Sequence, residues 1–238
     1  MIFEGFDKIK KAQNIARDAY LRMLDEIKPG MTEREIRKRF EMHLIDLGSF
    51  SFWRYGIGAT VHVGKDRSRD SRTTRAYRET EIVLGENDLL VFDIAPSVEF
   101  YWGDFSRTVF VEDGKVVKDY NQLKTPEFKD GIATELALHN YLLKVAKSDM
   151  TFEQLYRIMD TAIEALGYIN LDFGSNVGHS VELDSTKRRV LKAGEYQTLN
   201  MCDCFTFEPH IGTRDGRYGF KRENIYYFDE NGTLKELI

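Results

Sequence analysis

Residues 28–48 read KPGMTEREIRKRFEMHLIDLG, and residues 147–167 repeat the same pattern as KSDMTFEQLYRIMDTAIEALG. In both stretches a Met-Thr pair opens an amphipathic run that ends in Leu-Gly. We infer from this repetition an internal duplication of one half-domain. Two matching halves that face each other can each contribute acidic side chains to one shared site, so the positions of the acids become the main question.

The composition is typical of a globular chain, with 238 residues, 42% hydrophobic and 31% charged. We expect one domain over residues 1–238, divided internally at roughly 1–120 and 121–238. No apolar run is long enough to cross a bilayer, and the start MIFEGFDKIKKAQ lacks a secretory layout. The formal charge of −5 gives no reason to expect a nucleic-acid partner. Cys202 and Cys204 are too close together for a good structural disulfide, so we expect a reducing cytoplasm.

Helical periodicity predicts two pairs of helices. The first pair covers roughly 5–27 and a run opened by Thr32, which forms a capping-box pattern with Glu35 and ends at Gly48. The second pair covers roughly 127–147 and a run opened by Thr151. The side chains that we expect these helices to bury are Ile36, Phe40, Leu44 and Leu47 in the first half, and Ile132, Leu136, Leu143, Leu155, Met159, Ala162 and Leu166 in the second.

Segments rich in branched and aromatic residues follow each helix pair and predict strands. They cover 89–96 and 107–115 in the first half, and 197–209 and 224–233 in the second. Asp113-Gly114 and Asn231-Gly232 predict matching turns. The order of helices and strands predicts an α+β fold with antiparallel sheet. The stretch 65–80 predicts a charged loop.

Four carboxylates occupy matching strand boundaries in the two halves. Asp93 lies near the end of one strand and Asp104 opens the next, and Glu208 and Glu223 do the same in the second half. One such acid is usually solvated, but four that converge repel one another unless about two divalent cations compensate them. His179 adds a nitrogen ligand. Carboxylates with one imidazole suit Mn²⁺, Fe²⁺ or Co²⁺, with Zn²⁺ as a further option.

The stretch FDIAPSVEFYWGDFSRTVFV resembles the motif of the pita-bread metallopeptidase family, which includes methionine aminopeptidases, Xaa-Pro aminopeptidases and prolidases. That family shows an Asp, ten intervening residues and then Asp-x-x-Arg-Thr, as do Asp93 and Asp104. Gly178-His179, Glu208-Pro209 and Glu223 resemble its remaining motifs, in the same order. The resemblance covers roughly residues 6–236 and implies the pita-bread fold with two pseudo-symmetric halves.

The resemblance also implies a centre of two divalent metal ions, Mn²⁺ first among them. Asp93 would chelate one ion, Asp104 and Glu223 would bridge both, and His179 and Glu208 would hold the other. A water shared by the two ions would be the source of the nucleophilic hydroxide, and Glu208 would accept the proton that this water loses. The implied function is that of an aminopeptidase or dipeptidase, similar to Xaa-Pro aminopeptidases, which cleaves an amide bond in a small peptide or amino-acid-like substrate.

Several positions depart from the family pattern. One family histidine lies about 18 residues before the first ligand Asp, where this chain has Arg75. The His-Glu-x-Pro motif after the ligand His is missing, and Thr186 stands in the place of its histidine. The usual glycines after the ligand His and after Glu-Pro are Ser180 and His210. We expect that the metal ligands are kept and that the groups for proton transfer and substrate binding differ.

Two histidines are candidate catalytic replacements, His62 and His210, although a lone histidine is more often a packed or surface residue. We expect His43 and His139 to be structural residues of helices. The arginines of 65–80 pair either with Asp66, Asp70 and Glu79 or, through Arg75, with a substrate anion. Trp53 and Tyr55 are candidate walls of the substrate pocket, with core packing as the alternative.

Two other functions stay open. The loss of His-Glu-x-Pro is compatible with a metalloenzyme of the same fold that acts on a non-peptide amide or performs another metal-centred reaction. A non-catalytic binding protein is the second alternative, which the retention of five ligands opposes. A metal-free, creatinase-like enzyme fits poorly for the same reason. The sequence leaves open the substrate, the metal and whether a homodimer completes the pocket.

Overall fold

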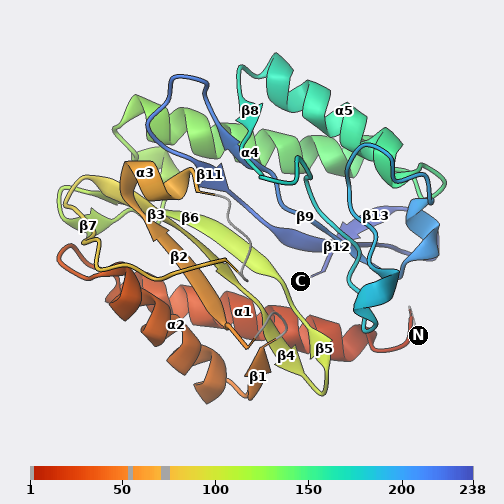
Figure 1. The fold of residues 1–238 in the computed structure, drawn as a ribbon, viewed down its shortest axis with the longest axis horizontal. Coiled ribbons are helices and arrows are strands. Elements are labelled where there is room, and N and C mark those ends of the chain that lie inside the picture. Colours follow the sequence, from red (N-terminus) through yellow and green to blue (C-terminus); the bar gives the residue numbers. More distant parts are fainter. Residues whose placement is uncertain (1–2, 53–55, 71–75, 238) are drawn as a thin grey trace.

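The computed structural model describes residues 3–52, 56–70 and 76–237. Each half begins with two helices, α1 (Phe6–Glu26) and α2 (Glu33–Asp46) in the first and α4 (Pro126–Val145) and α5 (Phe152–Ala165) in the second. The strands run between these two helix pairs, with α1 and α2 on one side and α4 and α5 on the other (Figure 1). The predicted α+β architecture is confirmed.

The repeated Met-Thr pair is a capping box in both halves. The Thr32 hydroxyl accepts from the backbone N–H of Glu35, whose carboxylate accepts from Thr32 N at 2.8 Å. Thr151 and Gln154 form the same reciprocal pair at the start of α5. Each box satisfies backbone donors that a helix leaves free at its start. The repeated sequence therefore corresponds to a helix that begins with the same capping box in both halves.

All strand pairs are antiparallel. In the first half the order is β2 (Ala59–Val63), β3 (Asp88–Ile94), β6 (Phe105–Glu112) and β7 (Lys115–Val116). In the second half, β12 (Asn224–Phe228) lies between β9 (Phe205–Phe207) and β13 (Leu234–Glu236), while β10 (His210–Gly212) lies between β8 (Ile169–Asn170) and β11 (Phe220–Lys221). The shorter elements are β1 (Ser51–Phe52), α3 (Gly64–Ser68), β4 (Pro96–Val98), β5 (Tyr101–Trp102) and the 3₁₀ turns η1 (Tyr120–Gln122), η2 (Ser185–Lys187) and η3 (Leu199–Met201).

The two halves meet along the start of β6. The backbone N–H of Glu223 donates to the carbonyl of Ser106 at 2.9 Å, and Lys221 N donates to the hydroxyl of Thr108 at 2.9 Å. The segment between β11 and β12 therefore lies beside the strand that follows Asp104. This contact brings the acids of one half next to the acids of the other.

Two predictions about buried helix faces are wrong. Leu143 is 39% exposed and Leu166 is 46% exposed, while Leu142 and Ile163 are buried in the core of the second half. In α4 the sequence pattern predicted Leu143 where the structure buries the preceding residue, Leu142. Leu166 is the C-cap residue of α5 and lies beyond the part of the helix that packs on the core. Leu47, Leu136 and Ala162 are only partly buried against the core. The other predicted core positions are buried.

The predicted strand over 197–209 is also wrong in its first part. Leu199 N and Asn200 N donate to the carbonyls of Met150 and Ser148, in the turn before α5. That pairing bends residues 199–201 into η3, and regular strand begins only at Phe205. Cys202 and Cys204 consequently precede the strand, and both are free thiols. The predicted loop over 65–80 begins with α3 instead.

Among the described helices, none combines the length and the apolar surface that a bilayer crossing requires.

Gly103 allows the turn before β6 to lie directly against α1. A Cβ atom at this position would lie 2.8 Å from Gln13 N and 2.9 Å from the carbonyl carbon of Ala12. Both are backbone atoms on the buried face of α1, so they have little room to move. Close packing of this turn on α1 fixes the backbone of the next residue, Asp104.

We predict that Gly103→Ala lowers the free energy of unfolding by about 1–3 kcal/mol, because the added methyl group overpacks this contact. Gly85→Ala is the matched control, since its Cβ would meet only Asp88 atoms, at 3.5 Å or more. Urea unfolding of both variants gives the comparison. Equal losses in the two variants would contradict the close contact between the turn and α1.

Candidate metal centre

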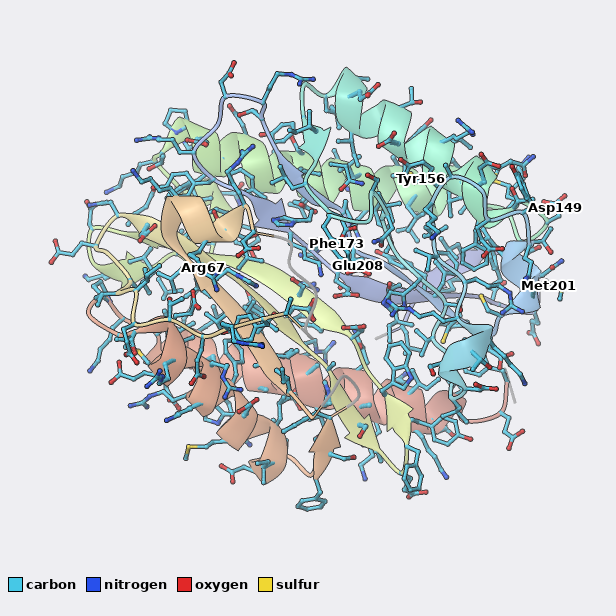
Figure 2. The ribbon with its side chains drawn as sticks, viewed as in Figure 1. Arg67, Asp149, Tyr156, Phe173, Met201 and Glu208 are labelled. Atoms are coloured by element: carbon cyan, nitrogen blue, oxygen red, sulfur yellow. The ribbon has the colours of Figure 1, made fainter. Side chains whose placement is uncertain are left out.

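Four carboxylates and one imidazole from the two halves come together in the structure. Ligand atoms of Asp104, His179 and Glu223 lie within 4.8 Å of one another, and so do those of Asp93, Glu208 and Glu223. Glu223 belongs to both groups. Glu208 lies near the middle of the molecule, between the two helix pairs (Figure 2). We call these five residues the carboxylate cluster.

The first half places Asp93 within β3 and Asp104 immediately before β6. The side-chain amide of Gln13, on α1, holds the backbone of Asp104 at both ends. Gln13 Oε1 accepts from Asp104 N at 3.0 Å, and Gln13 Nε2 donates to Asp104 O at 2.9 Å. This clamp explains a buried glutamine in an otherwise apolar helix face, and it fixes the direction of the Asp104 side chain.

Arg107 and Thr108 connect Asp104 to the second half. The guanidinium of Arg107 donates to the carbonyl of Glu223 at 2.7 Å and to Asn224 Oδ1 at 2.6 Å. Burial, with a smaller contribution from the neighbouring Arg222, lowers the pKa of Arg107 to about 9. The Arg-Thr pair after Asp104 therefore has a structural reason, because both side chains bind the segment that carries Glu223.

His179 is fully buried, and its tautomer follows from its hydrogen bonds. Nδ1 lies 3.0 Å from the carbonyl oxygen of Ser180, which can only accept, so Nδ1 carries the hydrogen. Nε2 then presents a lone pair, 3.4 Å from Glu208 Oε1 and 3.6 Å from Asp104 Oδ2. A histidine that donates through one nitrogen to a carbonyl is oriented as metal-binding histidines are. Gly178 allows the backbone before His179 to lie directly against β9, because a Cβ atom at position 178 would lie 2.1 Å from the Thr206 carbonyl oxygen.

Glu223 is the most deeply enclosed acid of the cluster. Its exposed fraction is 0%, and among the described residues neither carboxylate oxygen has a hydrogen-bond partner. Burial raises its pKa well above the usual value, and Asp104 and Glu208 raise it further by repulsion. A buried carboxylate without hydrogen bonds is costly unless a cation lies beside it. The donor set therefore fits a divalent metal ion.

Lys221 also belongs to this site, although it is not among the residues predicted from the sequence. Its Nζ atom lies 2.8 Å from both Asp93 Oδ2 and Glu208 Oε2, and 3.7 Å from Glu223 Oε2. Burial lowers the pKa of Lys221, but the three carboxylates outweigh this and raise it well above 10.5. The sequence contained one signal: Lys221 stands two residues before Glu223, and alternate residues of an extended chain share a face.

His62 lies on the same face of the sheet as Asp93, because Thr60 pairs with Asp93 and His62 with Val91. It is buried, its ring packs edge-on against Tyr77 at 5.4 Å, and its Nδ1 has no hydrogen-bond partner among the described residues. Burial lowers its pKa to about 3, with a contribution from Arg67. His62 is therefore neutral near pH 7, and its catalytic role remains a prediction.

His210 is held by the first half of the chain. Its Nε2 donates to the carbonyl of Ser68 at 2.7 Å, and burial lowers its pKa to about 4. The bond to Ser68 uses the only hydrogen of the neutral ring, so His210 has only an acceptor nitrogen left for a substrate. Thr186, in the register of the missing family histidine, is exposed, and its hydroxyl donates to Asp184 in a local turn.

The remaining candidates divide into three sets. Trp53, Tyr55 and Arg75 lie outside the described residues. Arg67 pairs with Asp70 at 2.6 Å, as predicted, and with Glu33 at 3.1 Å, whereas Glu79 pairs with Arg34 and Arg37 of α2 instead of the loop. His43 and His139 lie in helices as predicted, and bind Glu26 and the Tyr226 hydroxyl.

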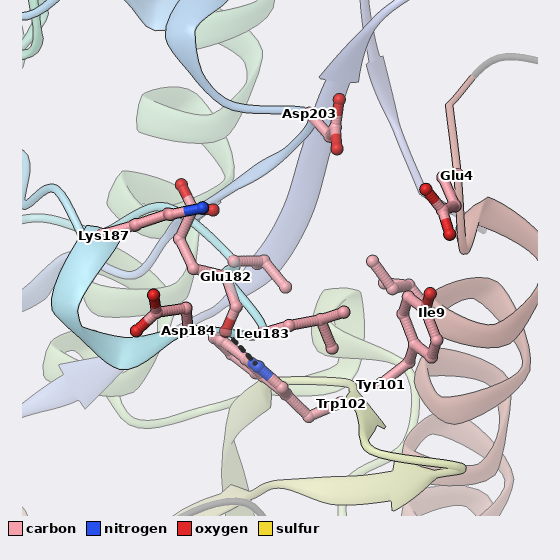
Figure 3. Close-up of a pocket in the computed structure, with 10 residues that line it drawn as sticks. Glu4, Ile9, Tyr101, Trp102, Glu182, Leu183, Asp184, Lys187 and Asp203 are labelled. Atoms are coloured by element: carbon pink, nitrogen blue, oxygen red, sulfur yellow. Dashed lines mark hydrogen bonds between the residues drawn. The ribbon is translucent and has the colours of Figure 1, made fainter.

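A pocket of about 220 Å³ is lined in part by Trp102. The Trp102 ring lies 5.8 Å from the ring of His179, and its Nε1 donates to the Glu182 carbonyl at 3.0 Å (Figure 3). The lining residues include Glu182, Asp184, Asp203 and Glu4, and none of the five cluster residues. The pocket is therefore an acidic neighbour of the cluster and not part of it.

Comparisons with known proteins identify the family and the fold. A family model described as metallopeptidase family M24 matches residues 7–230. The fold is similar to X-Pro aminopeptidase from Thermotoga maritima MSB8, with a TM-score of 0.78, 23% identity, and coverage of 97% of this chain and 60% of that one. Prolidase from Pyrococcus furiosus is similar with a TM-score of 0.78 and 21% identity, over 98% of this chain and 63% of that one. Xaa-Pro dipeptidase from Bacillus anthracis is similar with a TM-score of 0.77 and 20% identity, over 97% of this chain and 59% of that one.

The chain thus spans about three fifths of the length of these structures, and the likeness confirms the predicted pita-bread fold. No curated protein sequence matches the chain.

The low pKa of His62 predicts a loss of stability in acid. The unfolded state binds a proton near pH 6.5 and the folded state only near pH 3, so the free energy of unfolding falls as the pH drops between these values. His62→Gln removes this contribution. Between pH 7 and pH 5 we expect the wild type to lose about 2 kcal/mol more than the variant, in urea unfolding with a chelator present. Parallel pH profiles would contradict the low pKa.

Proposed function

The chain belongs to metallopeptidase family M24, and from this premise we propose that it is a metal-dependent hydrolase of the aminopeptidase or dipeptidase type. Its reaction would be cleavage of an amide bond next to a free amino group. The observation that carries the proposal is the carboxylate cluster, in which a fully buried Glu223 lies between acids from both halves.

The cluster would hold the metal through Asp104, His179 and Glu223, a set with one imidazole nitrogen and two carboxylates. Such a mixed set suits Mn²⁺, Fe²⁺, Co²⁺ or Zn²⁺. A divalent ion bound there would supply a polarised substrate carbonyl and a more acidic water. The sequence predicts two ions, and Asp93 and Glu208 would complete the second position together with Glu223.

Glu208 is the best candidate for the general base. Its side chain is 11% exposed, whereas the side chain of Glu223 is 0% exposed. A general base must come within hydrogen-bond distance of the proton that it accepts, and therefore needs access to the substrate and to water. Oε1 of Glu208 faces His179, and Oε2 faces Lys221. The lysine thus fixes one oxygen, and the other stays directed at the metal position.

The proposed substrate is a small peptide or an amino-acid-like amide. The similar structures are named as X-Pro aminopeptidase, prolidase and Xaa-Pro dipeptidase, which favours peptides with proline in the second position. One observation favours the alternative of a non-peptide amide: the register of the family's second histidine holds Thr186, whose hydroxyl is used in a surface turn. Either substrate would be cleaved by the same cluster.

Metal ligands and structural residues should respond differently to substitution. We predict that Asp104→Asn and Glu223→Gln each lower kcat/KM by more than about 100-fold, since even outer partners of metal ligands cost 10–100-fold. His43→Ala should leave turnover nearly unchanged, because His43 binds Glu26 away from the cluster. The measurement is amide hydrolysis by purified protein with added Mn²⁺, before and after chelation. Full activity after exhaustive chelation would rule out a metal-dependent reaction.

A substrate panel separates the two substrate classes. We expect Xaa-Pro dipeptides and short peptides with a free amino terminus to be hydrolysed, and the same peptides with an acetylated terminus to resist. Hydrolysis is followed by the release of the free amino acid. Turnover of non-peptide amides together with inert peptides would support the alternative instead.

A further inference from the structure

The ammonium group of Lys221 lies inside the carboxylate cluster. It contacts Asp93 and Glu208 at 2.8 Å and Glu223 at 3.7 Å. These are the same three residues whose oxygens form one of the two groups that could hold a metal ion. The lysine nitrogen therefore takes the place of a cation in that group.

The chemistry of the two groups differs in a way that matches this arrangement. Asp93, Glu208 and Glu223 offer only carboxylate oxygens, and an ammonium group has three donors and no acceptor. The other group, Asp104, His179 and Glu223, contains an imidazole nitrogen, His179 Nε2. Imidazole nitrogen is a common ligand of transition-metal ions, whereas carboxylate oxygens alone are sufficient partners for an ammonium group. The cluster thus contains one position suited to an ammonium group and one suited to a metal ion.

The backbone of Lys221 is fixed next to the cluster. Its N–H donates to Thr108 Oγ1 at 2.9 Å, and the Thr108 hydroxyl donates back to its carbonyl at 3.3 Å. β11 also pairs with β10, where Lys221 lies opposite His210. The side chain is only 13% exposed. These contacts come from both halves of the chain, so the lysine is part of the framework of the site.

The charges of the cluster agree with a single metal ion. Four carboxylates, one ammonium group and one divalent ion leave a net charge of −1, and a second divalent ion would make the site positive while the ammonium group stays. A second divalent ion at Asp93 and Glu208 would compete with the ammonium group for the same oxygens. Like charges at contact distance in a buried site repel strongly.

We propose that Lys221 is a resident cation that replaces the second metal ion, so that the cluster binds one divalent ion, at Asp104, His179 and Glu223. The inference rests on the proposed function only in assuming that the cluster binds a divalent ion. Two ions, as the family resemblance implies, would bind only after the lysine is removed.

The test is the Mn²⁺ stoichiometry of the purified full chain, by equilibrium dialysis and electron paramagnetic resonance. We expect one Mn²⁺ in the wild type and in Lys221→Arg, which keeps the charge. Lys221→Met should bind two ions and show the exchange-coupled signal of neighbouring Mn²⁺ ions. Lys235→Met, at an exposed lysine that lies 3.8 Å from Asp229, is the matched control and should bind one.

Two ligand variants sharpen the test without removing the lysine. Asp93→Asn should still bind one Mn²⁺, with an affinity within about tenfold of the wild type, because Asp93 contacts Lys221 and not the ion. Asp104→Asn should lose the ion. Loss of metal from both variants alike would contradict the proposal.

The other outcomes are equally decisive. Two ions in the wild type, or one ion in Lys221→Met, would overturn the resident cation while the metal-dependent function stands. No ion in either protein would overturn both. If Lys221→Met is recovered only with Mn²⁺ present, the wild-type stoichiometry and the Asp93→Asn result still decide the question.

Discussion

The mutual repulsion of buried carboxylates is the constraint on which this site depends. Glu223 is fully buried, and Asp104, Glu208 and Asp93 all raise the free energy of its ionised form. Four acids this close together, two of them buried and two partly buried, are stable only beside positive charge. The chain supplies one charge itself, through Lys221, and the pairing of His179 Nδ1 with a carbonyl directs Nε2 toward Asp104 and Glu208, where it would help to bind a second, external cation.

The architecture meets this constraint by joining the two halves at one edge. In each half one acid lies near the end of a strand, Asp93 in β3 and Glu208 just after β9, and another acid lies immediately before β6 or β12. The hydrogen bond from Glu223 N to Ser106 O places the starts of β6 and β12 side by side. Arg107 reinforces the junction through the Glu223 carbonyl. Gln13 fixes Asp104 from α1. The metal position is therefore a product of the packing between halves, and neither half contains it alone.

Much of this could be predicted from the sequence, because duplication and strand boundaries leave local signals. The capping boxes at Thr32 and Thr151 and the acids at Asp93, Asp104, Glu208 and Glu223 lie where they were expected. Features that depend on distant contacts were missed. The η3 turn forms because Leu199 pairs with Met150, and Lys221 enters the cluster because Thr108 fixes its backbone from the other half. Local periodicity contains no information on the contact of Leu199 with Met150, and for Lys221 it indicates only that this residue shares a face with Glu223.

The most direct test of the account is a crystal grown with Mn²⁺ and measured at a wavelength where manganese scatters anomalously. The account predicts an anomalous peak enclosed by Asp104, His179 and Glu223, with the Lys221 nitrogen still between Asp93 and Glu208. A crystal in which these side chains point apart, or in which no manganese peak lies among them, would contradict the claim that the two halves combine their acids around a metal ion.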